Sequence, residues 1–389
     1  MGLTFAHKRA RAIARGRGVA EAGPWRIIGL MSGTSMDGVD AALIETDGER
    51  VLAFGPALTL PYDEAQRAAL REAIAIAGGA GGATANDEVM RRAEALLTHT
   101  HAEAIARVLA AASASAADIH YAGFHGQTVL HRPHQKLTWQ IGDGAGLAAV
   151  SGIDVVFDFR TADVAAGGQG APLVPLYHRA LVEGLKTELP VAVLNIGGVA
   201  NVTWVGEDGA LLAFDTGPGN AAIDDWAFRH TGRAMDEDGM LALAGRVDAE
   251  VLGSMLDNPW FDAAPPKSLD RMDFSTAPVH GLAAEDGAAT LTAFTAQTIG
   301  LAARHFPEPA RRWLVCGGGR RNPVLMAALQ QVLRAPVERV EAVGWRGDFL
   351  EAEAFAFLAA RHLRGLPLSL PGTTGVPAPQ TGGRLALKP

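Results

Sequence analysis

Residues 29–40 read GLMSGTSMDGVD, an apolar strand that enters a small polar turn and returns along the alternating strand at residues 39–44. Two glycines, two hydroxyl residues and an aspartate make up the turn. Backbone N–H groups spaced this closely, with hydroxyls beside them, suit the oxygens of a polyphosphate. Taken alone, the pattern is also typical of an ordinary hairpin.

The strand-to-glycine pattern occurs twice more along the chain. Residues 191–205 read VAVLNIGGVANVTWV, a second apolar strand with a Gly-Gly turn and a returning strand. A glycine cluster at residues 317–319 follows a strand at residues 313–316 and precedes Asn322 and Pro323, which are typical of an N-cap and a first helical residue. Three such junctions predict two related lobes with a nucleotide in the cleft between them.

Composition narrows the class of protein. With 389 residues, 48% of them hydrophobic and 20% charged, the chain is typical of a soluble globular protein with two domains. A net charge of −8 argues against a general nucleic-acid binder, which needs a basic face. No stretch reaches the roughly 18 apolar residues of a membrane span. We therefore expect neither nucleic acid nor a membrane as a partner.

The single cysteine and the N-terminal segment bear on the compartment. Because Cys316 is the only cysteine, an internal disulfide and a Cys-rich metal site are both excluded, which fits a reducing cytoplasm. Residues 7–17 are rich in arginine but lack the apolar segment of a secretory signal. We interpret residues 1–24 as a disordered basic arm or an overextended start.

Helical patterns alternate with short apolar strands, which predicts an α/β fold. The predicted domains are a first lobe at residues 25–150, joined by the C-terminal segment 365–389, and a second lobe at residues 151–364. The predicted helices lie at residues 63–77, 85–112, 174–185, 221–231, 248–256, 287–305, 323–333 and 349–363.

Polar residues follow several predicted strands, where open α/β sheets place their sites. His125 and Thr128 follow a strand at residues 119–124. Arg160 and Asp163 follow another strand and precede the run AAGGQGAP, which is too rich in glycine for a helix interior and predicts a shaped loop.

The strongest catalytic candidate is the stretch AFDTGPGN at residues 213–220. Here a strand ends in Asp215, and a glycine-proline turn leads into a helix. A carboxylate at this point can accept a proton from an attacking hydroxyl or water. Alternatively, Asp215 is a turn residue that caps the helix containing Asp224 and Asp225.

Ordered polar and glycine-rich motifs extend over residues 25–389. They are residues 29–40, 125–128, 158–172, 195–201, 215–220, 266–268 and 315–322, and Glu351 with Phe355. These motifs resemble those of the 1,6-anhydro-N-acetylmuramic acid kinase family, in the hexokinase, Hsp70 and actin superfamily. The resemblance implies a two-lobed actin-like (ribonuclease H-like) ATPase fold with the nucleotide in the interlobe cleft, and a homodimer.

The resemblance also implies a reaction. ATP phosphorylates O6 of the anhydro sugar while water opens the 1,6-anhydro bridge at C1, which gives N-acetylmuramic acid 6-phosphate and ADP in peptidoglycan recycling. Asp215 matches the family's catalytic base, and we assign it to the water. Glu351 matches a glutamate near the sugar and is expected to orient substrate or water. In isolation, Glu351 is equally typical of an acid at a helix N-terminus.

For the nucleotide, the resemblance implies ATP with Mg²⁺. Asp37 is the candidate for the metal, through water, because Mg²⁺ takes few protein carboxylates; the alternative is a turn residue bonding its own backbone. Adenosine is expected over the glycine cluster, which would also suit a plain tight turn. The expected nucleotide-binding residues are Gly33, Thr34, Ser35, Met36, Asp37, Gly38, Val39, Asp40, Gly197, Gly198, Gly317, Gly318, Gly319 and Asn322.

The sugar is expected to contact His125, Thr128, Arg160 and Asp163. Arg160 suits the planar lactyl carboxylate, whereas His125 is equally typical of a structural histidine at a strand end. The family often has further basic residues after this arginine, where this chain has threonine and alanine. The residue that binds the carboxylate therefore stays open.

Two other functions share some of these features. A plain ATPase or nucleotide-switched binding module needs the three glycine junctions but not the set Asp215, His125, Arg160 and Glu351. Another carbohydrate kinase would use Asp215 as the base for a hydroxyl. Transfer to N-acetylmuramic acid, compared with its anhydro form, separates the two kinases.

Overall fold

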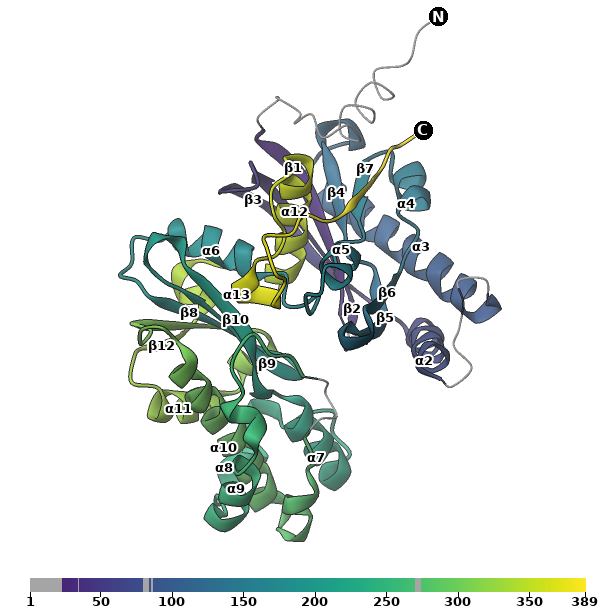
Figure 1. The fold of residues 1–389 in the computed structure, drawn as a ribbon. Helices are drawn as coiled ribbons and strands as arrows, with labels where there is room; N and C mark the ends of the chain where they lie inside the picture. Colours follow the sequence, from purple (N-terminus) through teal and green to yellow (C-terminus); the bar gives the residue numbers. More distant parts are fainter. Residues whose placement is uncertain (1–22, 34, 80–83, 85–86, 270–273) are drawn as a thin grey trace, which may run out of the picture. The chain divides into compact units, whose positions relative to one another are not determined.

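A computed structural model describes residues 23–33, 35–79, 84, 87–269 and 274–389. Thr34 and all but the last two residues of the predicted basic arm lie outside this part of the chain. The described chain divides into two compact units (Figure 1). Unit 1 extends to Gly184 and resumes at Phe349–Pro389, and unit 2 is Leu185–Asp348.

The central sheet of unit 1 follows the order β13-β7-β4-β1-β2-β3. β1, β2 and β3 are antiparallel neighbours, β4 and β7 continue parallel to β1, and β13 closes the edge antiparallel to β7. A separate hairpin pairs β5 with β6. The strands are β1 Trp25–Ser32, β2 Gly38–Thr46, β3 Val51–Pro61, β4 Tyr121–Phe124, β5 Gln127–Arg132, β6 Leu137–Ile141, β7 Asp154–Phe157 and β13 Arg384–Ala386.

Helices cover both faces of this sheet. On one face, Ile28 and Leu30 of β1 share a buried core with Leu70 of α2 and Leu97 of α3. On the other, α12 packs on β1, β2 and β4 (Figure 1). The helices of unit 1 are α2 Glu64–Gly78, α3 Glu88–Ala111, α4 Gly144–Ser151, α5 Thr161–Ala165, α6 Pro175–Glu183, α12 Leu350–Leu363 and α13 Pro371–Thr374.

Two glycines let α12 approach the sheet closely. A Cβ atom on Gly29 would lie 1.8 Å from the carbonyl oxygen of Ala352, and one on Gly123 would lie 2.2 Å from that of Phe355. Any side chain at these positions would push the helix away. The contact places the first turn of α12, which carries Glu351, against the sheet.

Unit 2 repeats the same topology in the order β10-β9-β8-β11-β12. β8, β9 and β10 are antiparallel neighbours, and β11 and β12 run parallel to β8. The core joins Phe214, Trp313 and Leu329. The elements are β8 Val191–Ile196, β9 Val199–Val205, β10 Leu211–Pro218, β11 Arg312–Cys316, β12 Val337–Arg339, α7 Ala221–Thr231, α8 Met240–Ala244, α9 Ala249–Leu256, α10 Ala284–Ala302 and α11 Pro323–Val332.

The shared strand order confirms the α/β class and the two related ribonuclease H-like lobes. The sequence boundaries at residues 150 and 364 nevertheless differ from those of the units. Residues 151–184 lie in unit 1 because β7 pairs with β4, and residues 349–364 lie there because α12 packs on its sheet. The predicted helices are confirmed in place, whereas the short helices α4, α5, α8 and α13 were not predicted.

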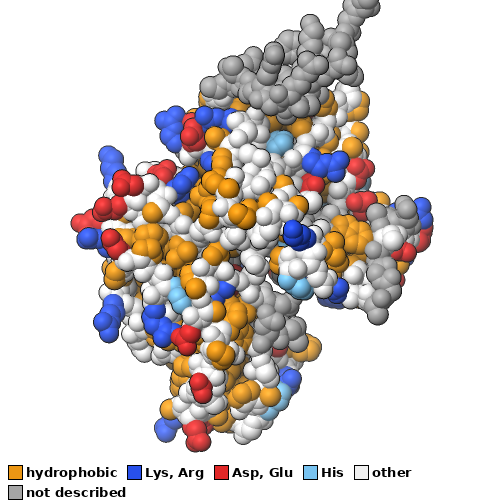
Figure 2. Space-filling model, in the orientation of Figure 1, with side chains coloured by type: hydrophobic (Ala, Val, Ile, Leu, Met, Phe, Trp, Pro, Cys, Tyr) orange, Lys and Arg blue, Asp and Glu red, His pale blue; other side chains and the backbone are white. Residues whose placement is uncertain are grey.

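Helix length and surface charge bear on possible partners. None of the helices in the described part of the chain is both long and apolar enough to cross a membrane. On the face shown in Figure 2, Lys and Arg side chains of the described residues are interspersed with Asp and Glu.

Candidate active site

The predicted site residues fall into both units. The polar turn, His125, Thr128, Arg160, Asp163 and Glu351 belong to unit 1, whereas Asp215 and the glycines at residues 197–198 and 317–319 belong to unit 2.

The turn between β1 and β2 is tight and partly exposed. Met36 has a φ of 54° and donates its backbone N–H to Gly33 at 3.1 Å. A Cβ on Gly38 would lie 2.4 Å from the Leu60 carbonyl oxygen, so only glycine lets β3 approach here. Val39 is fully buried and can offer a nucleotide only its backbone.

The carboxylates of this turn differ in their surroundings. Asp40 accepts a hydrogen bond from Thr59 Oγ1 at 2.5 Å. Asp37 is exposed, and its side chain has no hydrogen bond or ion pair to another described residue. No group of three or more His, Cys, Asp or Glu side chains in the described residues is arranged to bind a metal ion. A lone exposed carboxylate fits Mg²⁺ that takes its other ligands from phosphates and water.

His125 is buried and pairs with Arg160, which is half-buried. Arg160 Nε donates to His125 Nε2 at 3.0 Å, and His125 Nδ1 lies 2.8 Å from the Gly126 carbonyl oxygen. The imidazole therefore carries its proton on Nδ1 and is neutral. Burial and the neighbouring guanidinium hold the pKa of His125 well below its usual range. Both ring nitrogens are thus occupied within the protein.

Arg160 is held in place from a second side. Its Nη1 donates to the Gly170 carbonyl oxygen at 2.6 Å, which ties it to the glycine-rich loop. Burial lowers the pKa of Arg160 to about 10, against the opposing effects of Glu351 and Asp163. The guanidinium remains charged at neutral pH. Glu351 lies in the first turn of α12 and is half-buried.

The side chain of Asp163 accepts three internal hydrogen bonds. It is 2% exposed. Oδ1 accepts the Gly170 N–H at 2.6 Å, and Oδ2 accepts the hydroxyls of Ser369 and, at 2.6 Å, Thr374. The carboxylate joins the glycine-rich loop to the segment around α13. The predicted direct contact of Asp163 with the sugar would have to compete with these donors.

Thr128 lies at the start of the β5–β6 hairpin and is half-buried. Its hydroxyl accepts a hydrogen bond from Gln140 Nε2 at 3.2 Å across the hairpin. The hydroxyl hydrogen therefore remains available for another acceptor.

In unit 2, Asp215 lies within β10 rather than at its end, because the strand continues to Pro218 across a bulge between Asp215 and Gly217. The predicted strand end is thus wrong by three residues. Oδ2 accepts the Leu269 N–H at 2.8 Å. Burial raises the pKa of Asp215 to about 7, and the Leu269 hydrogen bond partly offsets the shift.

The two glycine turns of unit 2 meet at Asn220. The Asn220 N–H donates to the Gly197 carbonyl oxygen at 2.7 Å, and its Nδ2 donates to Ile196 at 3.2 Å. A Cβ on Gly319 would lie 3.0 Å from Asn220 Oδ1. Asn322 caps α11 as predicted, accepting two backbone N–H groups. These loops follow β8 and β11, which are parallel neighbours.

The sequence matches a known protein family over almost its whole length. The sequence model of the family described as anhydro-N-acetylmuramic acid kinase matches residues 25–387. The chain belongs to this family. A protein of that name from Paramagnetospirillum magneticum is 59% identical to this chain, and the match covers 92% of this chain and 98% of the relative. One from Acidiphilium cryptum is 58% identical, and the match covers 92% of this chain and 97% of the relative.

A solved structure outside the kinase family is much less similar. The activator of the 2-hydroxyisocaproyl-CoA dehydratase from Clostridium difficile with bound ADPNP gives a TM-score of 0.44 at 12% identity, covering 87% of this chain and 96% of that one.

Sequence reasoning missed several residues that support these groups. Asn220 belongs to the stretch AFDTGPGN, but the sequence did not indicate its role. Lys267 and Leu269 contact Asp215 although they lie more than 50 positions away in the chain. Ser369 and Thr374 reach Asp163 over 206 and 211 positions. Of these, only Asn220 and Lys267 gave a sequence signal, as members of family motifs.

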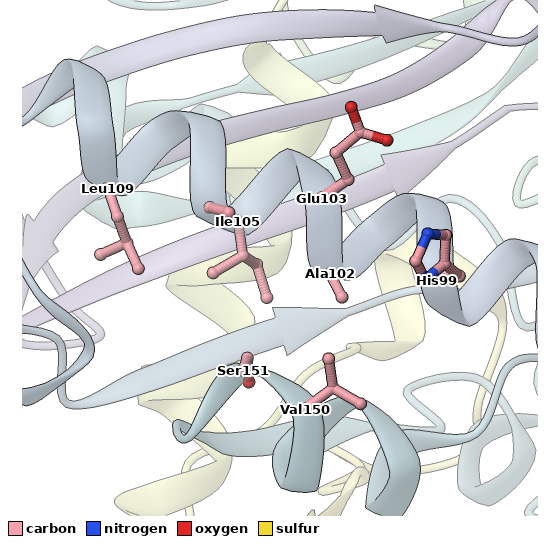
Figure 3. Close-up of a pocket in the computed structure, with 8 residues that line it drawn as sticks. His99, Ala102, Glu103, Ile105, Leu109, Val150 and Ser151 are labelled. Atoms are coloured by element: carbon pink, nitrogen blue, oxygen red, sulfur yellow. The ribbon is translucent and has the colours of Figure 1, made fainter.

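A hollow on the surface of unit 1 contains none of the predicted site residues. It lies between α3 and α4 and has a volume of about 380 Å³. Figure 3 shows Ile105 and Leu109 of α3 facing Val150 of α4. Its largely apolar lining gives it no evident part in phosphoryl transfer.

Proposed function

We propose that this protein transfers the γ-phosphoryl group of ATP to O6 of 1,6-anhydro-N-acetylmuramic acid while water opens the anhydro bridge at C1. The products are N-acetylmuramic acid 6-phosphate and ADP. Membership of the family over residues 25–387 supports the substrate and the reaction. The observation that best supports the mechanism is Asp215, a half-buried carboxylate with a raised pKa and one oxygen fixed by a backbone N–H.

We assign Asp215 as the base that activates the water attacking C1. As the water oxygen bonds to C1, its proton passes to Asp215, and the C1–O6 bond breaks. The electron pair left on O6 forms the bond to the γ-phosphorus, and the bond from that phosphorus to the ADP oxygen breaks. A carboxylate with a pKa of about 7 suits this task, because it is ionised in part at neutral pH yet basic enough to accept the proton.

Unit 1 supplies the groups that we assign to the sugar. Arg160 has two of its nitrogens engaged internally and keeps Nη2 to bind the lactyl carboxylate. His125 then acts through Arg160 rather than on the sugar. Thr128 and Glu351 remain candidates for the sugar hydroxyls and the water, and Asp163 is proposed to hold the loop that carries the Arg160 contact.

The nucleotide is assigned to the glycine turns of both units and to the backbone around Asp37. Mg²⁺, when bound, neutralises charge on the transferred phosphoryl group, and Asp37 is the residue proposed to hold it through water. The placement of ATP between the lobes stays a prediction. A cytoplasmic role in peptidoglycan recycling and a homodimer are also proposed, and light scattering on the purified protein tests the dimer.

The decisive experiment incubates the protein with Mg-ATP and the anhydro sugar in ¹⁸O-water and identifies products by mass spectrometry. We expect ¹⁸O at C1 of a 6-phosphorylated sugar for wild type and for Asp208→Asn, an exposed aspartate in unit 2. Asp215→Asn should lose the product. ADP without sugar phosphate would instead indicate an ATPase, and phosphorylation of N-acetylmuramic acid but not its anhydro form would indicate another carbohydrate kinase.

A further inference from the structure

A short segment of unit 2 lies along the free edge of β10 at Asp215. β10 is an edge strand of the sheet. The Asp215 N–H donates to the Lys267 carbonyl oxygen at 2.9 Å, and the Leu269 N–H donates to Asp215 Oδ2 at 2.8 Å. Residues 267–269, which we name the strap, therefore hold both the main chain and the carboxylate of Asp215.

The strap is anchored by the side chain of Lys267. Its Nζ donates to the carbonyl oxygens of Trp260 and Phe261, each at 2.9 Å, and lies 4.3 Å from the centre of the Trp260 ring. These acceptors belong to the short helix η5, Pro259–Asp262. Two carbonyl oxygens and an aromatic ring thus hold the ammonium group, as suits a fixed cation.

The helix η5 is itself fixed to the core. Phe261 is 3% exposed, and its ring centre lies 5.1 Å from that of Phe274 and 6.0 Å from that of Phe294 in α10. A continuous chain of contacts thus leads from α10 through η5 and Lys267 to the strap.

Two charged side chains among the described residues, Asp262 and Arg304, act on the ammonium group of Lys267. Burial lowers the pKa of Lys267 to about 8, Asp262 opposes the shift, and Arg304 adds to it. Arg304 is paired with Asp262 at 2.9 Å, and His305 Nε2 lies 3.0 Å from the same Phe261 carbonyl oxygen. Within the described ranges, the ammonium group contacts two carbonyl oxygens and the Trp260 ring, and no carboxylate forms an ion pair with it.

We propose that Lys267 is a positioning residue for the reaction, which fixes the strap so that the Leu269 N–H occupies Oδ2 of Asp215 and leaves Oδ1 for the attacking water. Among the described residues, Oδ1 accepts no hydrogen bond. The inference rests on the proposed role of Asp215 as the base.

A positioning role has a signature that a purely structural role lacks. The Leu269 hydrogen bond stabilises the ionised carboxylate and so lowers the pKa of Asp215 against the effect of burial. If the strap moves away, that pKa rises. The acid limb of the kcat profile then moves to higher pH, whereas general loosening lowers kcat evenly across the profile.

The test compares Lys267→Met with Lys267→Arg and with Lys186→Met, an exposed lysine of unit 2. For Lys267→Met we expect kcat at pH 7 to fall about tenfold or more with KM for ATP little changed, and the acid limb to move up by about 0.5 to 1 pH unit. Lys267→Arg should stay within about threefold of wild type, because the guanidinium keeps the charge and several donors. Lys186→Met should match wild type.

Leu269→Pro removes the strap N–H directly and does not depend on how Lys267→Met folds. It should move the acid limb in the same direction. In an Asp215→Asn background, Lys267→Met should cause little further loss of residual turnover. The proposal would be overturned if the acid limb of the kcat profile did not move in Leu269→Pro. It would also be overturned if Lys267→Met lowered turnover by the same factor in the wild-type and the Asp215→Asn backgrounds. If wild type itself forms no sugar phosphate, the proposed function fails instead.

Discussion

Arg160 Nε donates a hydrogen bond to Nε2 of His125 at 3.0 Å, and this contact fixes the state of the histidine. Because Nε2 must accept, the ring proton lies on Nδ1, which faces the Gly126 carbonyl oxygen at 2.8 Å. Protonation of the His125 ring would place a second positive charge beside the Arg160 guanidinium. The histidine is therefore a neutral acceptor that orients Arg160.

Replacing His125 with phenylalanine tests this role. The change keeps an aromatic ring against Phe355, whose centre lies 4.5 Å from the imidazole centre, but removes the acceptor for Arg160. A freed guanidinium should bind the sugar carboxylate less well, so we expect KM for the sugar to rise about tenfold, the equivalent of one charge-assisted hydrogen bond. Steady-state kinetics with varied sugar measures it.

His134→Phe is the matched control, because His134 is exposed in η2 (Pro133–Gln135), which connects β5 and β6. Its kinetic constants should equal those of wild type. An unchanged KM for the sugar in His125→Phe would show that Arg160 does not bind the carboxylate, or needs no orientation to do so.

The pH dependence of turnover follows from Asp215. Burial raises the pKa of this carboxyl to about 7, and only the ionised form can accept a proton from water. We expect kcat to rise with pH through a midpoint near 7 and then to level off. A kcat profile that is flat between pH 5 and pH 8 would contradict this assignment.

The same raised pKa predicts a pH-dependent effect on stability. The Asp215 pKa of about 7 in the folded protein exceeds the ordinary value of 3.8, so between these values the folded state binds more protons than the unfolded state. Stability from this group therefore falls as pH rises through that window. Asp215→Asn should raise Tm at pH 8 relative to wild type, with a smaller difference at pH 5, as scanning calorimetry can measure. A difference that does not depend on pH would contradict the prediction.

The sequence predicted features that local geometry imposes on residue type. Glycine marks positions such as Gly317, where φ is 73°, and a side-chain oxygen marks helix starts such as Asp63 and Asn322. These constraints act within a few residues, so a single sequence displays them.

Features set by distant contacts were not predictable in this way. The helix α12 is buried almost all round, so its pattern of apolar residues does not indicate which sheet it covers, and it was placed in the wrong lobe. Likewise, nothing near Asp163 indicates that Ser369 and Thr374 bind it. The family resemblance implies that Asp163 contacts the sugar, and the structure shows in addition its internal hydrogen-bond partners.

Removing the Asp163 carboxylate should destabilise unit 1. Asp163→Ala leaves the Gly170 N–H and the hydroxyls of Ser369 and Thr374 without their acceptor. Hydrogen bonds to a buried charge are strong, so we expect the free energy of unfolding to fall by about 3 kcal/mol or more. Urea unfolding measures it. Glu103→Ala removes only an exposed ion pair with Arg107 and should change stability by less than about 1 kcal/mol. An equal effect of both variants would show that the buried network is dispensable.

The glycine cluster after β11 gives a prediction about ATP. Gly317 has a φ of 73°, and a Cβ there would lie 2.4 Å from Asn195 Oδ1 and 2.6 Å from the Ile196 carbonyl oxygen. Gly317→Ala should therefore shift the turn predicted to receive adenosine and raise KM for ATP about tenfold or more, with KM for the sugar little changed. Gly253→Ala in α9 is the control, because a Cβ there meets nothing within 4 Å. If Gly317→Ala altered both Michaelis constants equally, or neither, the cluster would not be a specific part of the ATP site.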